Sequence, residues 1–113
     1  MTDDPPWLEL RATTDAVACS LGGAAFRERL SEFRETFADG YRGHDELARG
    51  VRWRFVSRPD LRPRLASLAT REHACCPFFH FVLRDVGDET WWEIRVGPAE
   101  EALLPALRGL PSS

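Results

Sequence analysis

Apolar residues recur along the chain at two spacings, which predict alternating strands and helices. Residues 7–12 and 17–21 alternate apolar and polar side chains, as short strands with one buried face do. Ahead of Gly40, large apolar residues three or four positions apart predict a helix: Phe26, Leu30, Phe33 and Phe37. A polar connection leads on to Gly50, within which residues 44–48 are compatible with an added helical turn.

The second half of the chain repeats these two patterns. Residues 51–55 alternate and predict a strand, and Asp60 is a candidate N-cap of a second helix. The core stripe of that helix is formed by leucines at Leu61, Leu65 and Leu68. Residues 78–83 are almost entirely apolar, which is typical of a central strand covered on both sides. Residues 90–96 complete a hairpin with it, and Gly97-Pro98 begins a short final helix.

These elements predict one α+β domain over residues 1–113, with an ordered core at about 7–110. The order β-α-β-α-β-β-α indicates a sandwich with a mixed sheet and helices mainly on one face. A chain of 113 residues, 43% of them hydrophobic, suits one core. No apolar run approaches the roughly 20 residues of a membrane helix, and the acidic N-terminus lacks the pattern of a signal peptide. We therefore expect a cytoplasmic protein without a membrane partner.

The charged residues argue against nucleic acid as a partner, but they leave open an anion or a protein. The 15 basic residues are all Arg and face 18 acidic residues, giving a net charge of −3 without any recognised nucleic-acid-binding motif. Nucleic acid is therefore not the expected partner. Between Arg49 and Arg71, however, there are seven arginines and one acid. This stretch is either a solvated strand edge and helix flank, balanced by the acidic residues 28–46, or a face that binds an anion or a protein partner.

The second helix carries the residues with the most chemistry. Four residues beyond Leu68, its core stripe reaches Glu72, and four further on it reaches Cys76. Cys75 lies near the same face. Pro77 disfavours helical backbone at the residue before it, so the helix should end there and Cys76 can redirect its side chain. Both thiols can then converge on one point.

Three cysteines are an odd number for a disulfide framework, and an intracellular chain keeps its thiols reduced. The remaining roles are burial as small apolar groups, thiol chemistry and metal ligation. Three thiolates suit thiophilic ions such as Zn(II), Cu(I) or Hg(II), although the spacing is not that of a zinc finger. The candidate metal ligands are Cys19, Cys75 and Cys76, with His73 or His80 as further ligands.

Two other functions remain open. In an enzyme, Cys75 would be the nucleophile and Glu72 would move protons, in thiol-disulfide exchange or in a protonolysis similar to organomercurial cleavage. Against redox use, a helix C-terminus raises the pKa of a thiol. Glu72 could equally form an ion pair with an inward Arg such as Arg27. The third reading is a sensor or interaction module with structural cysteines. Under any of these readings, exposed aromatic residues would indicate a homodimer.

The segment Glu72-His73-Ala74-Cys75-Cys76-Pro77-Phe78 resembles a group of small bacterial proteins built around a Glu-x-x-Cys-Cys-Pro-Phe motif. Members of that group also occur appended to regulators of the mercury-resistance type. Their early Ala-Cys-x-Leu strand is matched by residues 18–21, and their Arg-bearing helix by Arg27 and Arg29. The resemblance spans about residues 16–105 and implies that the three cysteines group with Glu72. The combined expectation is a protein that takes a metal ion or a small thiol as partner, for heavy-metal sequestration, resistance or sensing.

Overall fold

The computed structural model describes residues 7–13 and 23–112. The order of elements is β1 (Leu8–Leu10), α1 (Gly23–Phe37), β2 (Tyr41–Leu47), β3 (Gly50–Val56), α2 (Leu61–Cys75), β4 (His80–Val86), β5 (Glu89–Arg95), the 3₁₀ helix η1 (Pro98–Leu103), α3 (Leu104–Arg108) and the 3₁₀ turn η2 (Leu110–Ser112). The predicted strand over residues 17–21 lies outside the described residues. No helix in the described part of the chain is long and apolar enough to cross a bilayer.

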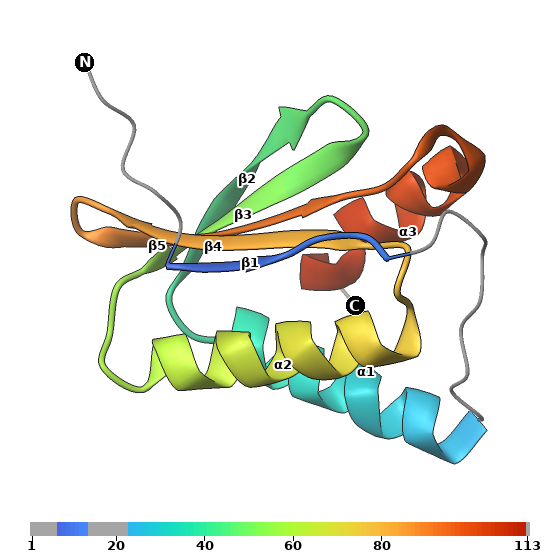
Figure 1. The fold of residues 1–113 in the computed structure, drawn as a ribbon. Helices are drawn as coiled ribbons and strands as arrows, with labels where there is room; N and C mark the ends of the chain where they lie inside the picture. The colour runs from blue at the N-terminus through green and yellow to red at the C-terminus, as the bar shows by residue number, and fades with distance from the viewer. Residues whose placement is uncertain (1–6, 14–22, 113) are drawn as a thin grey trace.

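The five strands form one sheet with the order β1-β4-β5-β3-β2. Figure 1 shows α1 and α2 side by side under one face of this sheet. α3 contacts β3 and contributes Leu104 and Leu107 to the same buried cluster. The α+β class and the placement of the helices on one face are therefore confirmed.

The prediction of a mixed sheet is wrong for the described strands, because every pairing among them is antiparallel. α2 crosses from β3 to β4, which run in the same direction, but β5 lies between those two strands and pairs with both. A two-residue turn joins β4 to β5, and its Gly87 has φ +61°, a conformation that glycine adopts without steric cost. This tight hairpin places β5 in the middle of the sheet.

The polar connection after α1 is a strand rather than a loop or a helical turn. β2 pairs with β3 only and forms an edge of the sheet, so its outer side faces solvent and lacks an apolar alternation. A register shift lies between Tyr41 and Gly43, and Gly43 has φ +148°. Asp45 of β2 is 3.1 Å from Nε of Arg54 on β3. Strand pairing and cross-strand charges therefore outweigh the low strand propensity of this segment.

Two further expectations need correction. β4 is covered on one face only by the helices that the structure describes, and its other face carries His80, Val82 and Arg84. Val82 is nevertheless buried there by its neighbours. Asp60 occupies the N-cap position of α2, but its side chain makes no capping hydrogen bond.

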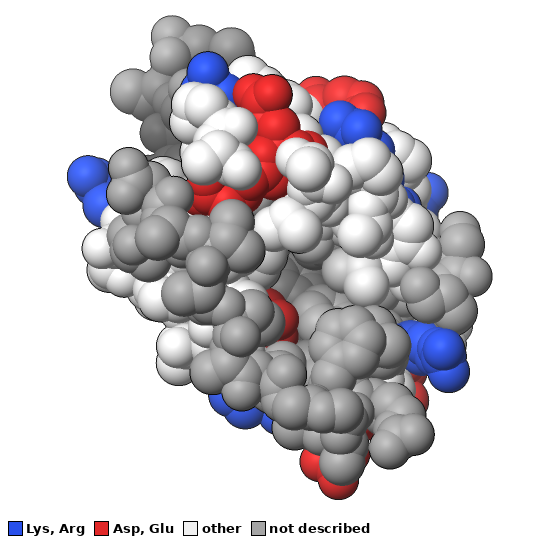
Figure 2. Space-filling model, turned by 90° about the vertical axis from the view of Figure 1, so that its right-hand side faces the viewer, with Lys and Arg blue, Asp and Glu red and all other residues white. Residues whose placement is uncertain are grey.

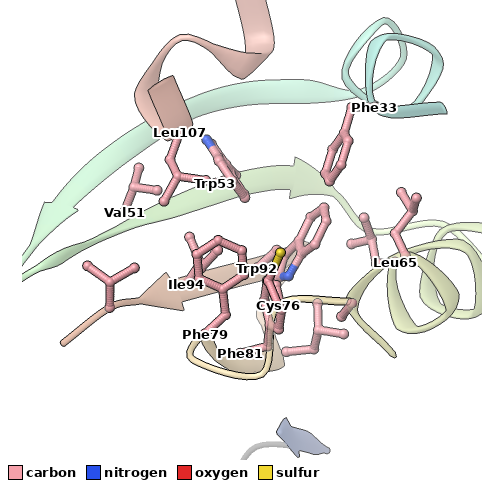
Figure 3. Packing of buried hydrophobic residues seen from close by; sticks show 14 of the residues in the cluster. Phe33, Val51, Trp53, Leu65, Cys76, Phe79, Phe81, Trp92, Ile94 and Leu107 are labelled. Atoms are coloured by element: carbon pink, nitrogen blue, oxygen red, sulfur yellow. The ribbon is translucent and has the colours of Figure 1, made fainter. Parts of the chain in front are cut away.

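Aromatic side chains fill the space between the sheet and the helices (Figure 3). Trp92 of β5 is completely buried at the centre, and its ring centroid lies 5.2 Å from that of Trp53. Phe33 of α1 stacks on Trp92 at 5.7 Å, and Phe37 contacts Trp53 at 5.2 Å. Phe33 and Phe37, the part of the predicted α1 stripe whose side chains the structure describes, therefore face the sheet and hold the helix against it.

Candidate functional site

Glu72 and Cys75 lie in the last turn of α2, and Cys76 follows directly after it. α2 ends at Cys75, and Cys76 leaves the helix with φ −127° and ψ 77°. The backbone N–H of Cys76 donates to the carbonyl oxygen of Glu72 at 2.7 Å. Pro77 explains the break, because its ring disfavours helical backbone at the preceding residue. The predicted end of the helix ahead of Pro77 is therefore confirmed.

Both thiols of this turn are buried. Cys75 is 8% exposed and Cys76 is 3% exposed, and both belong to the main apolar cluster. Figure 3 shows Cys76 among Phe79, Phe81 and Trp92. Such surroundings suit a small apolar group, and they also suit a soft ion that has shed its water.

A segment from the N-terminal part of the chain runs along this end of α2. The backbone N–H of Thr13 donates to the carbonyl oxygen of Pro77 at 2.8 Å. One turn earlier, Nε2 of His73 lies 2.6 Å from the carbonyl oxygen of Arg11 and must donate to it, because a carbonyl can only accept. Residues 11–13 are thus held at the C-terminal end of α2. Cys19, six positions after Thr13 in the sequence, lies outside the described residues.

The two candidate histidines lie in different places. His73 is on α2, two residues before Cys75, and its Nε2 donates to the carbonyl oxygen of Arg11. His80 is on the face of β4 that points away from the helices, and its Nε2 lies 2.8 Å from Oε2 of Glu9 on β1. This hydrogen bond holds the pKa of Glu9 below its ordinary value of 4.5. His73 is therefore close to the cysteines in sequence and binds residue Arg11, whereas His80 is hydrogen-bonded to the short edge strand β1.

Glu72 is half-buried beside a helix-to-helix ion pair. Nη1 of Arg71 donates to Oε1 of Glu32 on α1 at 2.8 Å. The hydrogen bond to Glu32 raises the pKa of Arg71, and the charge of Glu72 adds to the effect. The side chain of Arg27, the predicted partner of Glu72, lies outside the described side chains.

A complete metal centre is not formed by the described residues alone. Within 7–13 and 23–112, no group of three His, Cys, Asp or Glu side chains is placed to hold a metal ion. Cys75 and Cys76 supply two soft ligands at most, so a three-thiolate site needs Cys19. Figure 2 shows the end of the molecule at which α2 terminates, and its described surface is mostly neither basic nor acidic.

The arginines between Arg49 and Arg71 do not form one continuous face. Their described partners are spread over the molecule: Arg49 pairs with Glu101, Arg52 with Glu93 and Asp45, Arg54 with Asp45 and Glu89, Arg58 with Asp39 and Asp60, Arg62 with Asp85, and Arg71 with Glu32. Three of these acids belong to the stretch 28–46, as the solvation alternative predicts. Ion pairing within the protein therefore accounts for most of the basic stretch.

Sequence reasoning missed two buried carboxylates. Glu93 of β5 is 1% exposed although it lies on the sheet face away from the helices, and three arginines surround it. Glu100 of η1 is equally buried, and neither of its oxygens has a hydrogen-bond partner among the described residues. The available signal for Glu93 was its position on the same strand face as Trp91 and Arg95, alternating with the apolar residues Trp92 and Ile94. No comparable signal marked Glu100.

The chain matches no protein-family model, no curated protein and no solved structure. The resemblance to the Glu-x-x-Cys-Cys-Pro-Phe proteins therefore rests on the motif residues themselves.

Proposed function

We propose that this protein binds a thiophilic metal ion, Zn(II), Cu(I) or Hg(II), through Cys19, Cys75 and Cys76, in heavy-metal sequestration, resistance or sensing. The supporting observation is the 2.8 Å hydrogen bond from Thr13 to Pro77. It ties the start of the segment that bears Cys19 to the turn that bears the other two thiols. Six extended residues span at most about 20 Å, so Cys19 can reach the end of α2 from this anchor.

The chemistry of the turn supports the same proposal. Cys76 has left the helix, so its side chain need not point about 100° away from that of Cys75, as adjacent helical residues do. Polarisable thiolate ligands in apolar surroundings favour soft metal ions over hydrated hard ions such as Mg²⁺. Binding requires deprotonated thiols, so metal uptake releases protons and is expected to tighten as the pH rises.

Titration with Hg(II), Cu(I) and Zn(II) under reducing conditions tests the proposal. The ultraviolet thiolate-to-metal charge-transfer band and native mass spectrometry report the number of ions bound per chain. Competition with a chelator reports the affinity. We expect one ion per chain and at least a tenfold loss of affinity in each of Cys19→Ser, Cys75→Ser and Cys76→Ser. Ala74→Ser, at the exposed position directly before Cys75, is the matched control and should bind like the native chain. Native binding no tighter than that of the triple Ser variant would refute the site.

An enzyme that uses Cys75 and Glu72 is the second candidate. The two residues are three positions apart on α2, so their side chains project from neighbouring points of the helix surface. Burial of Cys75 works against it, because a nucleophile needs access to its substrate. Alkylation of the native protein distinguishes the two. Rapid labelling of Cys75, slowed in Glu72→Gln and unaffected by bound metal, would favour the enzyme.

A further inference from the structure

The sheet face opposite α1 and α2 is covered by none of the helices that the structure describes (Figure 1). Side chains that alternate with the core residues point out of this face. Its central arginines are Arg52 and Arg54 on β3, Arg84 on β4 and Arg95 on β5, and we call these four residues the arginine face. Trp91 and Glu93 of β5 lie among them.

The charges of the arginine face are arranged in two layers. The inner layer is anionic, because Glu93 is 1% exposed and Glu89 is 16% exposed. The four guanidinium side chains are 23–38% exposed and lie outside these carboxylates. Two other acids, Glu9 on β1 and Asp45 on β2, lie towards the sheet edges. A ligand that approaches the centre from solvent therefore meets guanidinium donors first.

Glu93 binds one of its three arginines closely and the other two loosely. Oε2 accepts from Nε of Arg52 at 2.7 Å. Oε1 lies 3.5 Å from Nη2 of Arg84 and 3.6 Å from Nη1 of Arg95, at or beyond the limit of an N–H···O bond, and accepts no hydrogen bond from a described residue. Nε of Arg84 is buried and also finds no acceptor in the described part of the chain. Arg84 and Arg95 thus keep donors that Glu93 does not use.

Arg52 is held in place by a neighbour as well as by Glu93. Its guanidinium carbon lies 4.2 Å from the centroid of the Trp91 ring, a cation–π contact. Nε1 of Trp91 donates to Oε1 of Glu89 at 2.9 Å, which fixes the ring in turn. Asp45 also lies 3.5 Å from Arg52, so the excess positive charge rests on Arg84 and Arg95, which share the carboxylate of Glu93. This part of the cluster is both pre-organised and under-neutralised.

We propose that Arg84 and Arg95, with Arg52 beside them, bind an oxyanion, the carboxylate or phosphate group of a small ligand. Guanidinium groups suit this role because their planar donors match two oxygens at once. Glu93 is the positioning residue that holds the three guanidiniums around one point. This site is independent of the thiols and lies on the opposite face of the sheet from α2.

The test is titration at constant ionic strength with inorganic phosphate and, separately, with citrate, using chloride as the reference anion. NMR shifts of the Nε–Hε groups of Arg84 and Arg95 are the readout. We expect saturation with a Kd of about 1 mM or tighter for one of the two anions, which identifies the ligand class. Shifts that do not saturate, or that chloride reproduces, overturn the proposal.

Variants separate a binding site from a structural ion-pair network. Arg84→Gln and Arg95→Gln should each weaken anion binding at least threefold, and together at least tenfold. Arg64→Gln, at an exposed position of α2, should leave the affinity unchanged. Glu93→Gln keeps an oxygen that can accept from Arg52 but removes the negative charge that Arg84 and Arg95 share, so it should tighten anion binding if the variant folds. The two single Arg variants carry the test if it does not. Unchanged affinity in the Arg84→Gln/Arg95→Gln variant would contradict the assignment.

Discussion

Arg52 and Glu93 form a cross-strand pair in register between β3 and β5, joined by the 2.7 Å hydrogen bond from Nε to Oε2. The carboxylate is buried and the guanidinium is partly exposed. Glu93→Ala leaves three arginines without their shared anion, and we expect it to lower the free energy of unfolding by about 1–3 kcal/mol. Asp45→Ala, which removes a more exposed partner of Arg52, should cost less than about 1 kcal/mol. Urea unfolding of both variants measures this difference, and equal losses would show that Glu93 is not central.

Gly50 at the start of β3 lies against the backbone of β5. A Cβ atom built on it would lie 2.2 Å from the carbonyl oxygen of Ile94, a backbone atom that cannot rotate away. Gly50→Ala should therefore separate the two strands locally and destabilise the protein by about 1–3 kcal/mol. Gly109→Ala is the matched control, because its added Cβ would be 3.5 Å from its nearest neighbour and its φ of −83° suits alanine. Thermal unfolding should show a clear loss for Gly50→Ala and a change within about 0.5 kcal/mol for Gly109→Ala.

Trp92 holds α1 to the sheet through its stacking with Phe33. Trp92→Ala would leave a cavity beneath Phe33, Trp53 and Phe81, and we expect a cost of about 3–5 kcal/mol. Val86→Ala, at the 38% exposed end of β4, should change stability by less than about 0.5 kcal/mol. Denaturant unfolding followed by far-ultraviolet circular dichroism compares the two. A loss below about 1 kcal/mol for Trp92→Ala would mean that this core repacks.

The helices and central strands could be predicted because their buried residues recur in the sequence with the period of a helix or a strand. Phe33 and Phe37 face the sheet as their spacing indicates, and β3 and β5 alternate as expected. β2 could not be predicted, because an edge strand stabilised by charges such as Asp45 carries no apolar period. The insertion of β5 between β3 and β4 depends on long-range pairing, which a one-dimensional pattern does not encode.

Of the candidate sites, too, the features with a local cause could be predicted from the sequence, and those that depend on strand pairing could not. The break of α2 at Pro77 is a local effect of proline, so the sequence was sufficient to predict it. The convergence of Arg52, Arg84 and Arg95 on Glu93 depends on the register of three strands, and no spacing within one segment reveals it. The grouping of Cys19 with the other cysteines stays a prediction, because Cys19 lies outside the described residues.

Acid should weaken the attachment of β1 to β4. The hydrogen bond from His80 lowers the pKa of Glu9 in the folded state, so its contribution is present above the ordinary value of 4.5 and is lost as the pH falls through the lowered value. Carboxyl NMR titration of Glu9 should give a pKa below 4.5 in the native chain and a return towards that value in His80→Ala. His44→Ala, at an exposed position of β2, should leave the titration of Glu9 unchanged. An unshifted Glu9 in the native chain would show that the contact with His80 is not populated.

Glu100 and Glu101 are adjacent in η1 and have opposite environments. Glu100 is 1% exposed, and its oxygens have no hydrogen-bond partner among the described residues, whereas Glu101 is 54% exposed and accepts from Nε of Arg49 at 2.9 Å. Burial of a carboxylate without a donor is unfavourable, so Glu100→Gln should raise the free energy of unfolding at pH 7 by about 1–2 kcal/mol. Glu101→Gln breaks a surface ion pair and should lower it by less than about 1 kcal/mol. Urea unfolding would show changes of opposite sign, and a destabilised Glu100→Gln variant would mean that the carboxylate has a favourable partner in solution.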